Sequence, residues 1–270
     1  MNCYSTVGNL QTRLGVGDNV SYFLTLLDAA SRVADQMSGR QFYVKTATKY
    51  FDGTMHPFIL LPDCLSITTL KTDPIRDETY TDSWTEGTDF VLEPRDSFPK
   101  MRLRKKVGSD RGFTIHGGKA WIQIVGQWGA GNMRSASAWV SVSETGTVAS
   151  TTGTTLALSN HDGLSPGHTI LVGTEQMFIT AVSGNNATVI RGVNGTTAAA
   201  HSAAAIYTAE YPAEVVRGTE AVACMMYRDM QRTGIQSEQI GNYSYSLSNP
   251  AHADTQVRRL FGMVRREPWV

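Results

Sequence analysis

The sequence predicts an α+β protein with a helical core, antiparallel β-hairpins or sheet, and an inserted all-β domain, either a small barrel or a sandwich. Two long segments carry apolar residues at three- and four-residue steps, the spacing typical of amphipathic helices. Other segments are short, alternate apolar with polar residues, and end at Gly, Asn or Asp turns, as strands do. The composition also changes near residue 141: as far as 208 the chain has almost no charge and much Thr, Ser, Gly and Ala.

The first long helix is expected at about 19–38. Asp18 is a suitable N-cap because its side-chain oxygen can accept a free backbone N–H, and Gly39 suits the left-handed residue after a helix. A shorter helix is expected at 7–14, ending at Gly15. The apolar stripe of the long helix comprises Phe23, Leu26, Leu27, Ala30, Val33, Ala34 and Met37.

Strands follow the first helix. Residues 42–51 alternate and end at Asp52-Gly53, a strong turn dipeptide, so residues 57–61 are expected to return as the partner strand of a hairpin. Trp121 and Trp128 are interpreted as core or rim anchors. Further strands are expected near 65–70, 89–92, 100–104 and 119–125.

The charge-poor region, 141–209, is expected to form a module of many short strands. Because helix-and-strand sequence resumes at Tyr211-Pro212, the module is interpreted as an insertion in a loop. Loop insertions cost little entropy, so we expect it to leave the host core intact. Its candidate strands are 146–149, 154–158, 168–172, 175–182, 186–191 and 204–208.

A second long helix is expected at 212–232, with Pro212 in its first turn. Gly218 lies in its interior, where glycine costs roughly 1 kcal/mol against alanine, and this predicts a close helix–helix contact. After Gly234, polar irregular chain is expected up to about 250. The predicted buried stripe comprises Val215, Val216, Thr219, Val222, Ala223, Met226, Tyr227 and Met230.

The C-terminal segment predicts a third amphipathic helix, capped by Asp254 and ended by Pro268. It has an apolar stripe with arginines on its other sides. Two interpretations are open: the stripe packs back on the chain's own core, or it fills a groove on a partner.

Charge and cysteine content narrow the classes of function. Lys plus Arg equals Asp plus Glu, at 24 each, so the chain is not expected to be a dedicated nucleic-acid binder. Cys3, Cys64 and Cys224 have neither metal-binding nor disulfide spacing, and the last two are expected to be small buried hydrophobes. No apolar run is long enough to span a bilayer and no signal peptide is evident, so an intracellular setting without membrane contact is expected.

The sequence suggests no enzyme. Gly163-Leu-Ser165-Pro-Gly167 matches GxSxG, and His116-Gly-Gly resembles an oxyanion-hole motif. The oxyanion hole, however, needs the backbone N–H of the residue after the serine, and Pro166 has none. The six histidines form no metal-binding pair on a helix, and no phosphate- or dinucleotide-binding motif occurs, so no metal and no cofactor are expected.

The order of several segments resembles the head–tail connector, or neck adaptor, family of tailed phages. The segment DAASRVADQMSGRQF is followed by a β segment and then by FILLPDCLSITTL; VGQWGAG follows at 125–131 and SEQIGNYSYS at 237–246. GHTILVGTEQMFITAV, within 141–209, looks like a β module inserted in phage tail and neck proteins. That module is absent from the simplest family pattern, which leaves its role open.

The resemblance implies a structural virion protein. Such a protein forms a homo-oligomeric ring of twelve subunits, assembled in the host cytoplasm. The ring binds the portal protein, joins it to the stopper or tail-terminator protein, and extends the channel used in viral genome ejection, through which DNA passes without sequence-specific binding. An alternative is a fibre- or capsid-binding module of the phage neck in which the β insert is the functional part.

The resemblance also implies a division of the chain. Residues 1–140 and 210–250 would form the adaptor core, 141–209 the inserted β domain, and 251–270 a C-terminal portal-docking arm. The expected docking residues are Val257, Arg258, Arg259, Leu260, Phe261, Met263, Val264, Arg265, Arg266 and Trp269.

Overall fold

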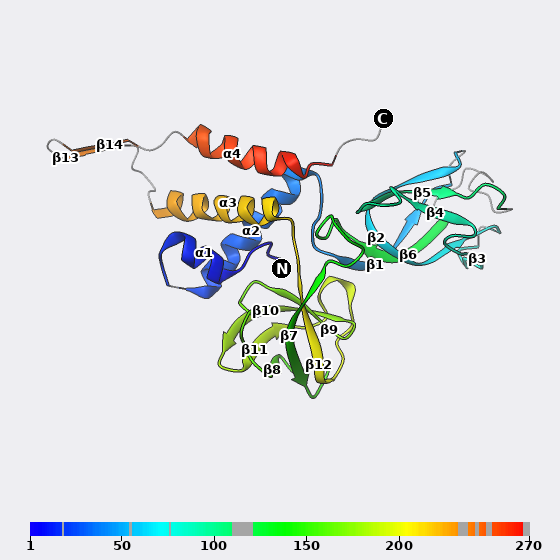
Figure 1. The fold of residues 1–270 in the computed structure, drawn as a ribbon, viewed down its shortest axis with the longest axis horizontal. Coiled ribbons are helices and arrows are strands. Elements are labelled where there is room, and N and C mark those ends of the chain that lie inside the picture. Colours follow the sequence, from blue (N-terminus) through cyan, green and yellow to red (C-terminus); the bar gives the residue numbers. More distant parts are fainter. Residues whose placement is uncertain are drawn as a thin grey trace.

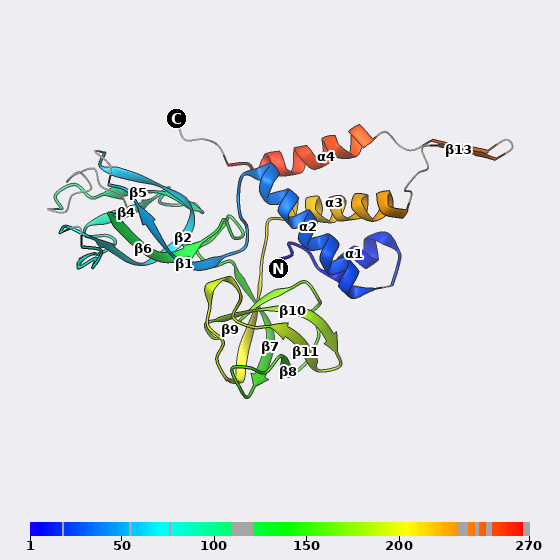
Figure 2. The ribbon, with the colours of Figure 1, turned by 180° about the vertical axis from the view of Figure 1, so that it is seen from behind.

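The computed structural model describes residues 1–17, 19–53, 56–75, 77–109, 121–231, 237–240, 243–246 and 250–266. It contains helices and antiparallel sheets, among them a closed six-stranded barrel, as the α+β prediction requires. Figure 1 shows three groups of elements: a layer of helices, a sheet beside it and the barrel below both. Figure 2 shows the same three groups from behind.

Four helices form the first group: α1 (Val7–Leu14), α2 (Val20–Ser38), α3 (Ala213–Gln231) and α4 (Pro250–Met263). Gly39 adopts the left-handed conformation after α2, as predicted, and Gly15, which was expected to end α1, adopts the same conformation. The expected cap Asp18 lies outside the described residues; the side chain of Asn19 caps α2 by accepting a hydrogen bond from the Tyr22 N–H at 3.1 Å. Asp254 does not cap α4, because that helix begins at Pro250.

The second group is a six-stranded antiparallel sheet in the order β1-β6-β2-β5-β4, with β3 paired to β2. Trp121 and Trp128 are buried in its apolar core, as expected. Its strands are β1 (Lys45–Phe51), β2 (Phe58–Thr72), β3 (Asp82–Trp84), β4 (Phe90–Glu93), β5 (Lys100–Lys105) and β6 (Ile122–Trp128).

The predicted hairpin of residues 42–61 is wrong. β6 lies between β1 and β2 and pairs antiparallel with both, so a distant segment occupies the place of the expected partner. Gly126 permits the close pairing, because a Cβ there would lie 2.5 Å from the Ser66 carbonyl oxygen. The two strands expected at 57–61 and 65–70 are one strand, β2, with register shifts along it.

The third group is the barrel, closed in the order β10-β11-β8-β7-β12-β9, with a short 3₁₀ turn, η1 (Val193–Gly195), between β11 and β12. All six of its strands overlap predicted ones, and a barrel rather than a sandwich is formed. Its strands are β7 (Trp139–Val148), β8 (Thr155–Leu158), β9 (Thr169–Val172), β10 (Glu175–Ser183), β11 (Asn186–Ile190) and β12 (His201–Ala209).

Glu175 organises one side of the barrel. Its buried carboxylate accepts hydrogen bonds from Arg191, His201 and the N–H groups of Gly192 and Ala199, at 2.7–3.0 Å. Burial alone would raise the pKa of Glu175, but these donors outweigh it and lower that pKa to about 2. The carboxylate thereby holds the segment that carries η1.

Residues expected to be irregular form a further antiparallel pair of strands, β13 (Ser237–Ile240) and β14 (Tyr243–Ser246). Among the described strands these two pair with each other alone. Both views show the pair extending away from the helices (Figures 1 and 2).

The largest apolar cluster joins side chains from all four helices, and it also includes Phe178 of β10, which is fully buried. The barrel has its own separate apolar cluster, of which Phe178 is not a part. The barrel therefore contributes a large aromatic ring to the helical core, and the expectation that the insert leaves the host core intact stays a prediction. The division of the chain into adaptor core, insert and arm stays a prediction.

Candidate functional site

The apolar stripe of α4 is packed against the chain's own helices. Val257, Phe261 and Val264 have 5 % or less of their surface exposed, and α4 contacts both α3 and α2. A Cβ added to Gly218 of α3 would lie 2.5 Å from the Phe261 ring, which confirms the predicted close helix–helix contact. Of the two interpretations left open by the sequence, this arrangement matches packing on the chain's own core.

The outer face of α4 is basic. Arg258, Arg259 and Arg265 are exposed, and so is Met263, whereas Leu260 is half-buried. Trp269 lies outside the described residues. The exposed residues among the predicted docking residues are therefore Arg258, Arg259, Met263 and Arg265. Their role in portal docking stays a prediction.

The end of α4 is fastened to the sheet and to α2 by two arginines. Arg40 donates from Nε to the Val264 carbonyl at 2.9 Å and forms an ion pair with Asp63 at 2.7 Å, both side chains being 6 % exposed. Arg266 donates from its backbone N–H to the Ser38 carbonyl and from its guanidinium to the Leu61 carbonyl, each at 2.8 Å. Arg266 is therefore a fastening residue here rather than an exposed one.

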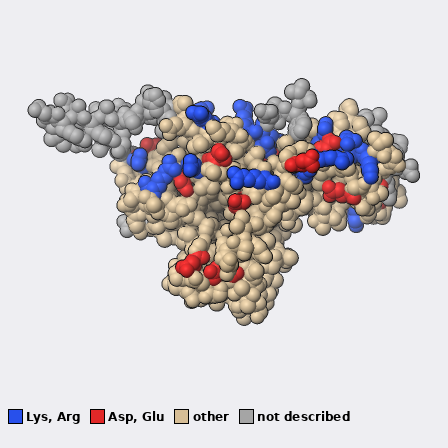
Figure 3. Space-filling view, in the orientation of Figure 1, with Lys and Arg blue, Asp and Glu red and all other residues tan. Residues whose placement is uncertain are grey.

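Beside α4 lies an open groove of about 660 Å³ between α1, α3 and α4. Arg13 pairs with Glu220 at 3.2 Å, while Arg217 and Arg228 are exposed. Figure 3 shows Lys and Arg spread over the helices, with none on the visible face of the barrel. The groove is lined by Arg13, Arg217, Glu220, Ala221, Cys224, Met225, Arg228, Gln256, Val257 and Leu260.

The sequence reasoning missed this groove and the Arg40–Asp63 pair. A signal for the groove was present, because Arg217, Glu220, Ala221, Cys224 and Arg228 recur at helical spacing on a second face of α3. No local pattern could have joined Arg40 to Asp63, which lie on different elements. Cys64 and Cys224 are buried, as predicted.

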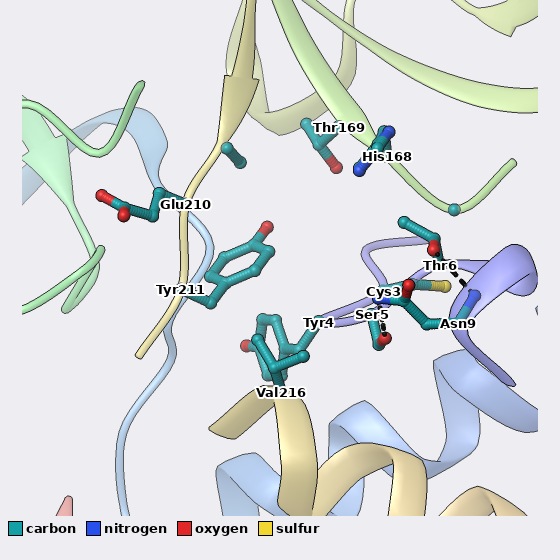
Figure 4. A pocket seen from close by; sticks show the side chains of 12 residues that line it. Cys3, Tyr4, Ser5, Thr6, Asn9, His168, Thr169, Glu210, Tyr211 and Val216 are labelled. Atoms are coloured by element: carbon teal, nitrogen blue, oxygen red, sulfur yellow. Dashed lines mark hydrogen bonds between the residues drawn. The ribbon is translucent and has the colours of Figure 1, made fainter. Parts of the chain in front are cut away.

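A smaller cavity of about 210 Å³ lies where the barrel meets the N-terminal residues (Figure 4). The Tyr211 ring points toward Thr169 and His168 across it. Burial raises the pKa of Tyr211 and lowers that of His168 to about 4. The cavity is smaller than the several hundred Å³ common in ligand sites, so it is treated as part of the seam between barrel and helices.

Side-chain amides hold that seam together. Asn2 and Asn194 donate to each other's carbonyl oxygens at 2.8 and 3.0 Å, Asn194 also donates to Gln176 at 2.8 Å, and Gln176 donates to the Val44 carbonyl at 3.1 Å. The Val7 N–H donates to the Pro166 carbonyl at 2.9 Å. The barrel is thus joined to the N-terminal residues and to the start of the sheet by directional bonds.

The GxSxG match does not form a nucleophile–base pair. The Ser165 backbone N–H, not its hydroxyl, donates to Nδ1 of His168 at 3.1 Å, and Gly167 packs against the Ser5–Thr6 backbone. His116 lies outside the described residues. Within the described ranges no group of His, Cys, Asp or Glu could hold a metal ion, and no described helix is both long and apolar enough to cross a membrane.

No protein-family model matches the chain, and no curated protein matches it.

Proposed function

We propose that this chain is a structural virion protein, a head–tail connector that forms a dodecameric ring between the portal and the stopper or tail of a tailed phage. The observation that carries the proposal is the β13–β14 pair. It coincides with SEQIGNYSYS, one of the segments on which the resemblance rests, and it extends beyond the helices (Figure 1). An isolated two-stranded hairpin is marginally stable in water, so such an element favours a chain whose partner supplies further contacts.

The outer face of α4 supports the proposal. The apolar stripe of α4 is already buried against the other helices. A portal would therefore contact the exposed face of α4, which carries Arg259, Arg265 and Met263. A cationic face of this kind suits an acidic portal surface, because charge complementarity steers association and fixes its orientation. In this proposal α4 docks as a preformed helix rather than as an arm that folds on binding.

The balanced charge of the chain suits the proposed channel. A channel through which DNA slides must not neutralise many phosphates, since each neutralised phosphate adds affinity. In the same proposal the helices and sheet form the adaptor core, and the ring acts by assembly, without catalysis or a cofactor.

The test is electron-microscopic imaging of the chain mixed with its cognate portal. We expect rings seated on the portal, and expect Arg259→Glu with Arg265→Glu to abolish capture while leaving the unfolding temperature unchanged. Arg134→Glu is the matched control, because Arg134 is also exposed but lies in the loop before the barrel. Undiminished capture by the α4 variant would remove α4 from the docking surface, and absence of any complex with the wild-type chain would overturn the proposal.

The alternative, a neck module that binds fibre or capsid through its barrel, has less support. Between residues 141 and 209 the aromatic residues are Phe178 and Tyr207. Phe178 is buried among the helices and Tyr207 is 38 % exposed, so a groove lined with aromatic rings cannot be built there.

A further inference from the structure

The groove between α1, α3 and α4 has the composition of a protein-binding surface. Its apolar lining, called the floor below, comprises Ala221, Cys224, Met225, Val257 and Leu260. Arg217 and Arg228 also line the groove, and among the described residues neither forms an ion pair. The nearby Glu220 binds Arg13 and Ser5 instead. A fitting ligand is therefore an apolar side chain flanked by carboxylates.

A segment of that chemistry lies elsewhere on the same chain, in the loop between β2 and β3. Ile75 is 72 % exposed, and Asp77 and Glu78 beside it are exposed as well. Arg76, between them, lies outside the described residues. Ile75 is thus an accessible apolar side chain next to two carboxylates.

The loop is held in shape before any partner arrives. The Asp73 carboxylate accepts hydrogen bonds from the backbone N–H groups of Asp77 and Glu78 at 3.3 and 2.8 Å, and Asp77 accepts from the Thr79 N–H at 3.1 Å. Preorganisation of this kind reduces the entropy lost on binding. The loop therefore presents Asp77 and Glu78 in defined positions.

Groove and loop lie at opposite ends of the molecule. β3, which follows the loop, is at one end of the long axis, and α1 and α3 are at the other (Figure 1). A contact between two different surfaces of identical chains is heterologous and leads to a ring when the rotation closes. From charge complementarity and this placement we propose that the groove binds the 73–79 loop of a second copy of this chain, with Ile75 on the apolar floor and Asp77 and Glu78 against Arg217 and Arg228.

This inference rests on the proposed ring, for which it names the contact between subunits. It is tested with two variants that each damage one half of the contact: Ile75→Asp for the loop, and Arg217→Glu with Arg228→Glu for the groove. Each should weaken self-association at least about tenfold, as loss of a central interface residue does. Val107→Asp and Arg134→Glu are the controls, because Val107 is 89 % exposed in the turn after β5 and Arg134 lies outside the groove.

Mixing the two damaged variants gives the sharpest readout. One intact loop and one intact groove remain in the mixture, so sedimentation should show a 1:1 dimer and nothing larger. A symmetric contact, or one formed elsewhere, would not give this result. The three positions substituted in the damaged variants are exposed, and unchanged circular dichroism and unfolding temperature would show that the variants fold.

A cross-link tests the contact directly. A chain carrying Ile75→Cys, mixed under oxidising conditions with one carrying Gln256→Cys in the groove, should form a disulfide-linked dimer. Val107→Cys paired with Gln256→Cys should not. Native Cys224 lines the groove, so both chains also carry Cys224→Ser, while Cys3 and Cys64 are buried outside it.

The outcomes separate this inference from the proposed function. Rings on the portal that are unaffected by either damaged variant would overturn the loop–groove contact and leave the connector function standing. The contact would also be overturned, whatever the portal experiment shows, if the wild-type chain stays monomeric at millimolar concentration and the Ile75→Cys and Gln256→Cys chains form no cross-link. Loop–groove oligomers without portal capture would support the contact and overturn the connector function.

Discussion

α4 and the barrel both pack against the other helices, but the contacts that hold them there differ in chemistry. α4 is held by apolar side chains, chiefly Val257 and Phe261, and by the Arg40 fastening at its end. The barrel inserts the Phe178 ring but otherwise meets the N-terminal residues through the amides of Asn2, Gln176 and Asn194.

Apolar burial and hydrogen bonding contribute differently: burial mainly supplies stabilisation, and hydrogen bonds mainly fix the orientation of the two parts. Full burial of one large apolar side chain stabilises by about 1.5–3 kcal/mol and has no preferred direction. Hydrogen bonds between amides contribute about 1 kcal/mol net but require defined geometry. We conclude that α4 is retained mainly by burial, and that the barrel, with one aromatic ring and a bonded network, is fixed in its orientation.

The largest expected effects come from the two buried rings. Phe261→Ala and Phe178→Ala should each lower the free energy of unfolding by about 3–5 kcal/mol, because each leaves a cavity in the shared cluster. Urea unfolding measures the loss, and amide hydrogen exchange should show faster exchange in α2 for both variants. Tyr207→Ala is the control on the barrel. If Phe178→Ala affected the barrel strands alone, the barrel would not be part of the helical cluster.

The second-largest expected effect comes from Arg40, which binds the end of α4 and pairs with Asp63. Arg40→Met should cost about 3 kcal/mol, because it leaves the Asp63 carboxylate buried without its partner. Adding Asp63→Asn should recover part of this loss, since the amide needs no counter-charge. Chemical denaturation of the three variants measures both steps, and a double variant no more stable than Arg40→Met would show that the carboxylate is not the cause.

The pH dependence of folding stability should have opposite signs for a carboxylate in the helices and one in the barrel. Burial raises the pKa of Asp35 to about 6, although hydrogen bonding from Tyr4 and the charge of Arg32 oppose it. The folded state therefore binds this proton more tightly than the unfolded state, whose pKa is near 4, and stability should fall by roughly 2 kcal/mol as the pH rises from 4.5 to 7.

Asp35→Asn should flatten that slope in urea titrations at several pH values. Glu175 has the opposite sign: its lowered pKa means that its contribution is present above about pH 4.5 and is lost as the pH falls toward 2. An unchanged slope in Asp35→Asn would assign the pH dependence to another group.

The smallest expected effect concerns the amide network. Asn194→Gly should cost about 1 kcal/mol, because Asn2 and Gln176 lose a partner while glycine accepts the left-handed backbone at this position, where φ is 57°. Limited proteolysis between barrel and helices should nevertheless become faster. Thr151→Gly, at an exposed loop of the barrel, is the control, and equal proteolysis of both variants would argue against an orienting role for the network.

Elements with strong local signals could be predicted from the sequence. The helix at 7–14 was predicted with the bounds of α1, and Gly15, Gly39 and Gly218 have the expected roles. The barrel strands were found because Gly and Asn turns separate short alternating segments. The groove was missed, since it is formed by helices that are distant in sequence.

The sequence by itself determined the helices, most strands and the change of composition that marks the barrel, because periodicity and turn residues act over a few neighbours. Tertiary structure alone decided that β6 separates β1 from β2, that Phe178 belongs to the helices, and that the α4 stripe is covered. These outcomes depend on which apolar surfaces meet after the chain folds back on itself, and such contacts between distant residues have no local pattern.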